Sequence, residues 1–319
     1  MKQMISDLVP NQDVTSFFLI ADLPQVRKSK KGSDYACLEL VDASGKVDAR
    51  LWDVPAGLGV NSLKKVIVKV KGTTSEWDGK LQVSISQIRK VEEADGVDLG
   101  DFFEASPFDP KEMWSELMQI VGGVANGYVR QLLFDVLREN EVNFKRAPAA
   151  KSIHHCYISG LLEHSLSLCK TALLICERYS LDKDLMVAAC CLHDLSKIDE
   201  LDYSMGNSYT LQGSMLGHLA MGMMRVSEAI NKIEGFPPLL KIAILHMIAA
   251  HHGSLAWGSV RVPLMKEALA FHLCDMLDSR LAICDRALRG NVNEHGLTDF
   301  VRELEGPLWR GPWQEEESK

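Results

Sequence analysis

The stretch "KDLMVAACCLHDLSK", residues 183–197, decides how this chain of 319 residues is interpreted. Its apolar run, Leu185–Leu192, suits a buried helix and is far shorter than the roughly 20 residues that a membrane span needs. The run ends on a neighbouring histidine and aspartate, His193 and Asp194. A carboxylate in an apolar segment is costly unless it is paired or bound to a cation. The stretch therefore predicts a core helix that carries two polar side chains towards an interior site.

The composition is typical of a soluble globular protein, with 46% hydrophobic and 24% charged residues. The N-terminal residues MKQMISDLVPNQD lack the apolar region of a signal peptide. Eight cysteines are scattered without a CxxC pair, so free thiols in a reducing compartment are expected. These features predict a cytoplasmic protein with no membrane partner.

The charge is distributed unevenly along the chain. The net charge is −8, yet residues 1–90 hold 14 lysines and arginines against 10 acidic residues. A mildly basic first part is therefore joined to an acidic second part, and the overall negative charge does not exclude a nucleic acid as partner.

The same two parts differ in hydrophobic periodicity. Before residue 95, apolar residues alternate with polar ones, as in Val47, Ala49 and Leu51, and turn signals such as "DASGK" separate the segments. This pattern predicts a small OB-like β-barrel over residues 1–95. Residues 96–110 show no period and are expected to form a linker. From residue 111 to 319, apolar residues recur every three or four positions, which predicts an all-helical second domain.

Candidate metal ligands are spread over the expected helices, about 25 to 35 residues apart, as suits successive helices whose ends converge. Imidazole nitrogens and carboxylate oxygens together suit Mn²⁺, Fe²⁺, Zn²⁺ or Mg²⁺. His246 and His272 also lie on apolar helices, where a histidine is more often a hydrogen-bonded core residue, and we expect them to support the site rather than bind metal. The candidate ligands are His164, His193, Asp194, His218, His251, His252 and Asp275.

The order H…HD…H…HH…D resembles that of the HD-domain metal-dependent phosphohydrolases. The strings "HHCYISGLLEHS", "CLHDLSKIDEL", "GSMLGHL", "HMIAAHHG" and "EALAFHLCDMLDSRL" resemble more closely the YhaM-type 3′–5′ exoribonucleases. That group also has an N-terminal OB-fold, and the resemblance extends from about residue 13 to residue 290. Ser196, Ser159 and Ala256 stand where the family often has glycine, glycine and an acidic residue.

The resemblance implies a ligand set. His164, His193, Asp194 and Asp275 would bind one divalent ion, and Asp194 would bridge to a second ion bound by His218 and by His251 or His252. Manganese is the expected metal, with magnesium, iron and zinc as alternatives. Water activated by the metals would attack the phosphodiester, and the Lys197 ammonium would contact the phosphate or the leaving oxygen. A solvated lysine at a helix end is the alternative for Lys197.

Further residues are candidates for binding the substrate. Lys145, Arg146 and Lys151 form a small basic group, although a solvated loop explains them equally well. His155 belongs to one of the strings above and could contact RNA. In the β domain, aromatic side chains could stack on bases, unless they belong to the core; these are Trp52, Trp77, Phe17 and Phe18.

The expected function is that of a hydrolase, a metal-dependent 3′–5′ exoribonuclease that degrades single-stranded RNA, with single-stranded DNA as a second substrate. Two alternatives stay open. One is a phosphohydrolase of small or cyclic nucleotides, although "HHGSLAWGS" lacks a GYP-like motif. The other is a non-catalytic OB-fold protein that binds nucleic acid, against which the complete ligand set argues. The oligomeric state is left open.

Overall fold

The computed structural model describes residues 3–20, 22–28, 32–52, 59, 63–97, 99–103, 105–150, 156–202 and 208–312. These residues form two compact units that divide between Ala105 and Ser106. The division falls within residues 96–110, where the sequence predicts a linker.

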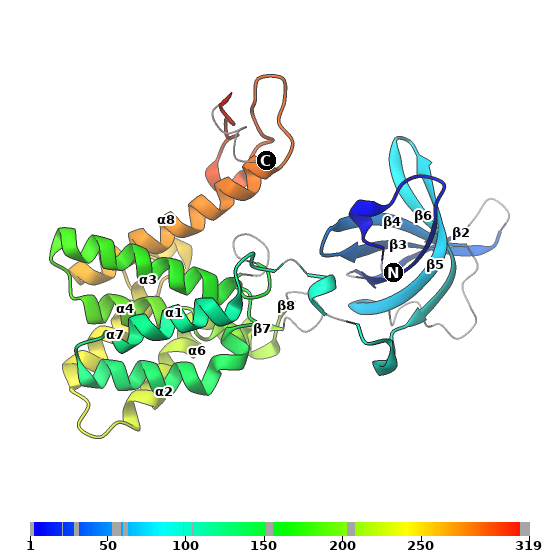
Figure 1. The fold of residues 1–319 in the computed structure, drawn as a ribbon. Helices are drawn as coiled ribbons and strands as arrows, with labels where there is room; N and C mark the ends of the chain where they lie inside the picture. Colours follow the sequence, from blue (N-terminus) through cyan, green and yellow to red (C-terminus); the bar gives the residue numbers. More distant parts are fainter. Residues whose placement is uncertain are drawn as a thin grey trace. The chain divides into compact units, whose positions relative to one another are not determined.

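The N-terminal unit is a small β-barrel (Figure 1). Its strands are β1 (Asp13–Ile20), β2 (Gln25–Lys28), β3 (Asp34–Asp42), β4 (Gly45–Leu51), β5 (Val66–Trp77) and β6 (Lys80–Lys90). The order is β1-β5-β6-β4-β3-β2, and β3 also pairs with β1, which closes the barrel while β2 extends β3. The pair β4–β6 is parallel and the others are antiparallel. This is the topology of an OB-fold, which confirms the predicted barrel.

Alternation along the strands separates the barrel core from its surface. Val47, Ala49 and Leu51 of β4 are all buried, as their spacing predicts. Phe18 of β1 is also completely buried in this core. It is therefore not available to stack on bases, and the alternative that it belongs to the core holds for Phe18, because its strand position faces inward. Phe17 faces the other side of β1, where it is half-buried against Leu19 and its neighbours.

The second unit is built from helices, as predicted. They are α1 (Pro110–Gly122), α2 (Gly127–Phe144), α3 (Gly160–Tyr179), α4 (Lys183–Leu192), α5 (Lys197–Glu200), α6 (Leu211–Asn231), α7 (Pro238–Ala250) and α8 (Lys266–Arg289). Several helices begin at a capping side chain that accepts backbone N–H bonds. Asp109 caps α1, Asn126 caps α2 and Asp182 caps α4.

Helix α4 lies at the centre of this unit. Every residue from Leu185 to Leu192 is buried, because α4 packs against α2, α3, α7 and α8. A helix that is apolar on all sides must be enclosed by others. Its C-terminal end therefore delivers the next residues into the interior of the unit.

Two segments of the second unit are not helical. Strands β7 (Leu201–Asp202) and β8 (Ser208–Tyr209) form a short antiparallel pair. After α8, residues 290–312 contain isolated bridges and one short 3₁₀ turn. The prediction of an all-helical domain thus holds for the body of the unit but not for these segments, where Gly290 and Asn291 favour a turn after α8.

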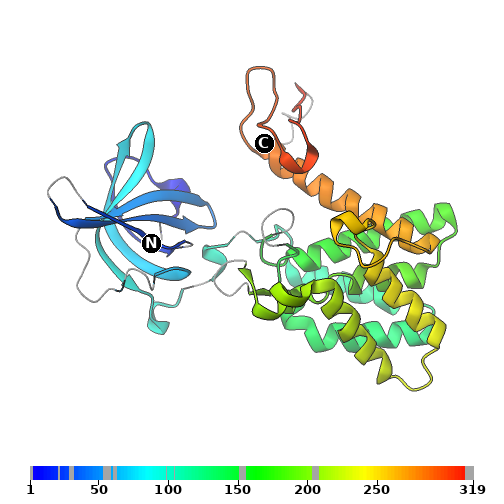
Figure 2. The same cartoon turned by 180° about the vertical axis from the view of Figure 1, so that it is seen from behind.

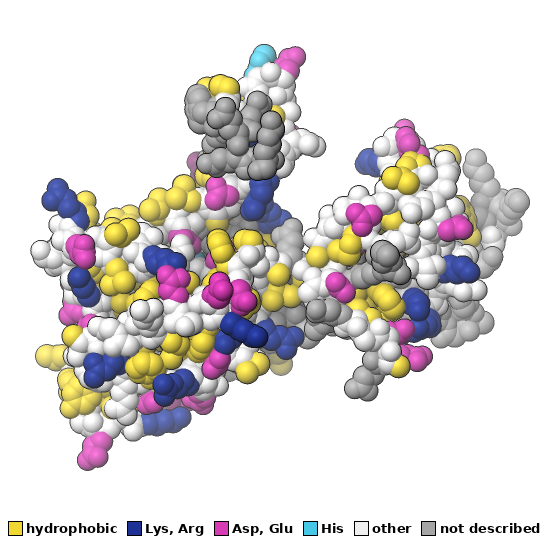
Figure 3. Space-filling view, viewed as in Figure 1, with side chains coloured by type: hydrophobic (Ala, Val, Ile, Leu, Met, Phe, Trp, Pro, Cys, Tyr) yellow, Lys and Arg dark blue, Asp and Glu magenta, His cyan; other side chains and the backbone are white. Residues whose placement is uncertain are grey.

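Helix α8 extends beyond the body that α3, α4 and α7 form (Figures 1 and 2). Its fully buried residues Ala268, Phe271 and Cys274 all lie in its first turns. On the face shown in Figure 3, cationic and acidic side chains are interspersed over the helical unit. Among the described residues, no helix has the length and apolar character required to cross a bilayer.

Candidate metal centre

The helical unit brings together ligands that are distant in sequence. His164 lies near the start of α3, His218 lies in α6 and Asp275 lies in α8, while the HD and HH pairs directly follow α4 and α7. The potential ligand atoms form two groups, and within each group they lie within 4.8 Å of one another. The first group is His164, His193 and Asp275; the second is His218, His251 and His252.

Asp194 lies between the two groups. Its Oδ2 atom is 3.2 Å from His193 Nε2 of the first group. Its Oδ1 atom is 3.5 Å from His218 Nε2 and 3.8 Å from His251 Nε2 of the second. One carboxylate thus faces both groups, which is the arrangement that a bridging ligand requires.

In all five of these histidines, the Nδ1 atom contacts a hydrogen-bond partner. The Nδ1–H groups of His193, His251 and His252 donate to the backbone carbonyls of Ala189, Ile248 and Trp257 at 3.1, 2.7 and 3.0 Å. A carbonyl can only accept, so the proton is on Nδ1 in each ring. The Nδ1 atoms of His164 and His218 face the carboxylates of Asp278 and Glu200. The Nε2 atoms, which are the atoms that would bind metal, therefore face the site.

The residues present fit a bound cation. Among the described residues, the buried atoms His193 Nε2, Asp194 Oδ1 and His218 Nε2 have no hydrogen-bond partner. Buried polar atoms are almost always satisfied, and each exception requires a physical reason. Their position at the junction of the two groups, with carboxylate and imidazole donors around them, suits a divalent metal.

A kink in α6 positions His218. Gly217 has φ 72° and ψ 156°, a conformation that interrupts the helix and that side chains strongly disfavour. The His218 N–H consequently donates to Glu200 Oε1 at 3.0 Å instead of to the helix, and the His218 Nδ1 atom lies 3.1 Å from the same oxygen. Glu200 is buried at 6% exposure and was not predicted. Its sequence neighbourhood, "KIDEL", resembles any solvated helix end and carries no signal for this role.

Asp278 positions His164. The Asp278 Oδ2 atom is 2.7 Å from His164 Nδ1, and the Ser167 hydroxyl donates to its other oxygen. Burial opposes protonation of His164, but hydrogen bonds to Asp275 and Asp278 outweigh it and raise the pKa of His164 to about 10. A metal ion on the Nε2 atom of His164 must therefore displace a proton.

In the second ligand group, the pKa values of His251 and His252 are lowered, whereas that of His164 in the first group is raised. Burial lowers the pKa of His251 well below its usual value. Burial, together with the neighbouring His218, lowers the pKa of His252. Both rings are therefore neutral near pH 7, which is the state that coordinates metal.

Lys197 lies at the start of α5 and close to the HD pair. Helix α4 ends at Leu192 and a turn intervenes, so Lys197 is not on a continuation of that helix. Its ammonium is 2.6 Å from Asp194 Oδ2, and its side chain is only 12% exposed. Lys197 is thus not a solvated lysine at a helix end. Burial opposes ionisation of Asp194, yet Lys197 and the neighbouring imidazoles outweigh it and hold the pKa of Asp194 well below its usual range.

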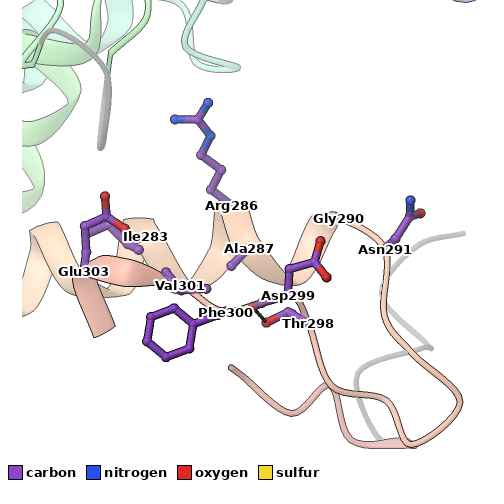
Figure 4. Close-up of a pocket in the computed structure, with 10 residues that line it drawn as sticks. All are labelled: Ile283, Arg286, Ala287, Gly290, Asn291, Thr298, Asp299, Phe300, Val301 and Glu303. Atoms are coloured by element: carbon purple, nitrogen blue, oxygen red, sulfur yellow. Dashed lines mark hydrogen bonds between the residues drawn. The ribbon is translucent and has the colours of Figure 1, made fainter. Parts of the chain in front are cut away.

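A pocket of about 240 Å³ opens onto this cluster. Asp194, Lys197, His251, His252 and Asp275 line it, together with Trp257, His272, Met276 and Ser279. A separate pocket lies between the end of α8 and residues 298–303. There Arg286 extends away from the hydrogen bond between the Thr298 hydroxyl and the Asp299 carbonyl (Figure 4). That pocket contains none of the described candidate ligands.

The predicted substrate-binding residues do not all gather at the cluster. The Lys145 ammonium pairs with Glu141 and lies 5.1 Å from the ring centre of Trp114, and Arg146 is exposed nearby. Neither is among the residues that line the metal pocket. Trp52 lies in the β unit, and His155 and Lys151 lie outside the described residues. His246 and His272 take supporting roles: His246 accepts from the Leu264 N–H, and His272 donates to the His251 carbonyl.

The family model of the HD domain matches residues 161–280, a span that contains all seven predicted ligands. A 3′–5′ exoribonuclease called YhaM, from Bacillus subtilis (strain 168), is 34% identical over 285 residues. The match covers 89% of this chain and 90% of the relative. The chain belongs to the YhaM-type exoribonuclease family. This confirms the resemblance inferred from the ligand order, and the YhaM-type family combines the HD domain with the OB-fold seen here.

Solved structures similar to the YhaM-type chain include a crystal structure of a replication protein A domain from Methanococcus maripaludis. It is 24% identical, with 30% of this chain and 99% of that chain covered and a TM-score of 0.24. A replication protein A heterotrimer bound to single-stranded DNA is 15% identical, with 30% of this chain and 69% of that chain covered and a TM-score of 0.21.

Proposed function

We propose that this chain is a metal-dependent 3′–5′ exoribonuclease that hydrolyses single-stranded RNA. The observation that carries the proposal is the Asp194 carboxylate between two ligand groups, with unpartnered buried atoms around it. The activity named for its relative supports the same reaction. Single-stranded DNA is a second substrate in this proposal, because the metal cluster acts on the phosphodiester and not on the sugar.

Two divalent ions, manganese in the cell, complete the site. His164, His193, Asp194 and Asp275 hold the first ion, and Asp194, His218 and the pair His251–His252 hold the second. Mixed nitrogen and oxygen ligands without thiolates suit manganese. When bound, the ions supply an activated water and offset charge on the phosphate oxygens.

Lys197 acts beside them. With the negative charge of Asp194 directed towards metal, the Lys197 ammonium is free to turn from that carboxylate to a phosphate oxygen in the same pocket. Asp275 and the histidines hold their positions through the hydrogen bonds described above, so the site needs little rearrangement when substrate enters.

The β unit holds the strand. The rings of Tyr35 and Trp52 stack with centroids 4.9 Å apart and 28° between their planes, and the Arg50 guanidinium lies 5.8 Å from the Tyr35 ring centre. Trp52 is 45% exposed. An aromatic pair with one exposed ring, beside a cation, can stack on bases of any sequence. The eight cysteines are all free thiols, which supports location in the cytoplasm.

The decisive experiment uses one RNA labelled at either end. With Mn²⁺, the 5′-labelled strand should shorten stepwise from its 3′ end, and the reaction should stop with chelator or in Asp194→Ala. The matched control Asp285→Ala, at an exposed position of α8, should retain activity. Internal cleavage, or hydrolysis of cyclic nucleotides with intact RNA, would contradict the proposal.

A further inference from the structure

Trp257 is an exposed aromatic residue in the metal pocket. It ends the short 3₁₀ turn η5 (Leu255–Trp257), which lies shortly after the HH pair that follows α7. Its side chain is 58% exposed, although it lines the same pocket as Asp194, Lys197 and Asp275. A large apolar ring held in water beside a polar reaction site costs free energy that burial elsewhere would have avoided.

The backbone holds this turn in place. The carbonyl of Trp257 accepts from Nδ1–H of His252 at 3.0 Å, so the turn is attached to a candidate metal ligand. The Trp257 N–H donates to the Ser254 carbonyl at 3.0 Å. The buried Ser259 hydroxyl fixes the end of the loop to the Ala249 carbonyl at 3.0 Å. The backbone that carries the indole therefore has a fixed position relative to His252, a candidate metal ligand.

The pocket is chemically divided. Trp257 and Met276 contribute apolar surface, whereas the other described lining side chains are carboxylates, imidazoles, an ammonium and a hydroxyl. The polar groups are suited to a phosphodiester and its metal ions. A nucleotide also carries a flat base, whose π-face is matched by an indole ring and not by the carboxylates, the ammonium or the hydroxyl of this pocket.

We propose that Trp257 stacks on the base of the nucleotide whose phosphodiester lies at the metal ions. This inference rests on the proposed nuclease function and specifies how that site binds its substrate. Stacking on an indole tolerates any base. Trp257 therefore favours phosphodiesters that carry a base over those that lack one, without selecting a sequence. The ring contributes to substrate binding. Its removal should therefore raise KM more than it lowers kcat.

The test compares the full-length wild type with Trp257→Ala and Trp257→Phe on two RNAs. One ends in an ordinary 3′ nucleotide, and the other ends in an abasic ribose. Trp257→Ala should raise KM for the ordinary RNA on the order of 10-fold, Trp257→Phe should restore most of it, and the abasic RNA should not distinguish the variants. Trp309→Ala, which removes a 54% exposed tryptophan outside this pocket, should match the wild type. An equal loss on both RNAs, or an unchanged KM, would overturn the proposal.

A binding measurement separates this inference from the proposed function. Adenosine monophosphate and ribose 5-phosphate are titrated into the wild type and Trp257→Ala with Mn²⁺ present. The wild type should prefer adenosine monophosphate, and the variant should lose that preference. Equal affinities in the wild type would overturn the stacking role, whether or not the chain degrades RNA. Preference without any RNA degradation would overturn the nuclease proposal and support the stacking role.

Discussion

Lys197 is a largely buried cation that faces a candidate metal ligand. In the proposed contact, the ammonium donates a hydrogen bond to a phosphate oxygen and stabilises the negative charge that develops there during the reaction. Replacing it in Lys197→Met should lower kcat on the order of 10²-fold, while Lys197→Arg recovers part of the loss. Metal content, measured by elemental analysis, should be unchanged in both. Loss of metal in step with activity would show that Lys197 instead maintains the cluster.

His164 couples metal binding to pH. Its pKa is raised to about 10 by Asp275 and Asp278, against burial. It is therefore protonated below that pH, the metal competes with the proton, and metal affinity should rise as pH increases towards about 10.

Calorimetry of Mn²⁺ binding in two buffers of different ionisation enthalpy, at pH 8, measures the released proton. Asp278→Asn should reduce this release, because one of the two carboxylates that hold the proton is gone. It should also weaken metal binding by about 10- to 100-fold, as loss of a group that orients a ligand does. Asp285→Asn on the same helix is the control. An unchanged proton release in Asp278→Asn would contradict the role of Asp278.

At the residue scale, the ligands could be predicted but their supports only in part. Asp278 shares a helix face with Asp275, so the spacing of the two carboxylates already points to a common site. Glu200 could not be found in this way. Its contact to His218 depends on the approach of α5 to α6 and on a backbone N–H released by a kink, neither of which periodicity reports.

At the element scale, the kink in α6 is the feature that apolar spacing concealed. The spacing over "GSMLGHLAMGMM" predicts a regular helix, because apolar residues occur at helical spacing on both sides of Gly217. Only the backbone angles of Gly217 show that the helix changes direction before His218.

Gly217→Ala tests this feature. Its conformation disfavours any side chain, so the substitution should lower the free energy of unfolding by about 1–3 kcal/mol and displace His218 from the second ligand group. Urea unfolding and metal stoichiometry measure the two effects. Gly127→Ala, in the first turn of α2 with open space around the added methyl, should be neutral or stabilising. A stable Gly217→Ala protein with full metal content would contradict the role of the kink.

At the scale of the whole molecule, two units with separate cores divide binding from chemistry in the proposed function. Trp52→Ala should then raise KM for a 30-nucleotide RNA several-fold, since base stacking contributes about 1–3 kcal/mol per base. Hydrolysis of a dinucleotide, whose single phosphodiester lies at the metal site of the helical unit in this proposal, should be unaffected. Steady-state kinetics on both substrates measure the difference. A similar change on the dinucleotide would place Trp52 outside a strand-binding role.

The sequence by itself determined the β-barrel, the helical body and the set of candidate metal ligands. These features can be predicted from neighbouring residues in the chain. Examples are the alternation in β4, the apolar run of α4 and the order of histidines and aspartates. The tertiary structure alone decided that Asp194 faces both ligand groups, that the Nε2 atoms face the site, and that Glu200 and Trp257 belong to it. These features depend on helix ends from residue 164 to residue 275 meeting in space, and a hydrophobic period specifies which face is buried but not which side chains meet there.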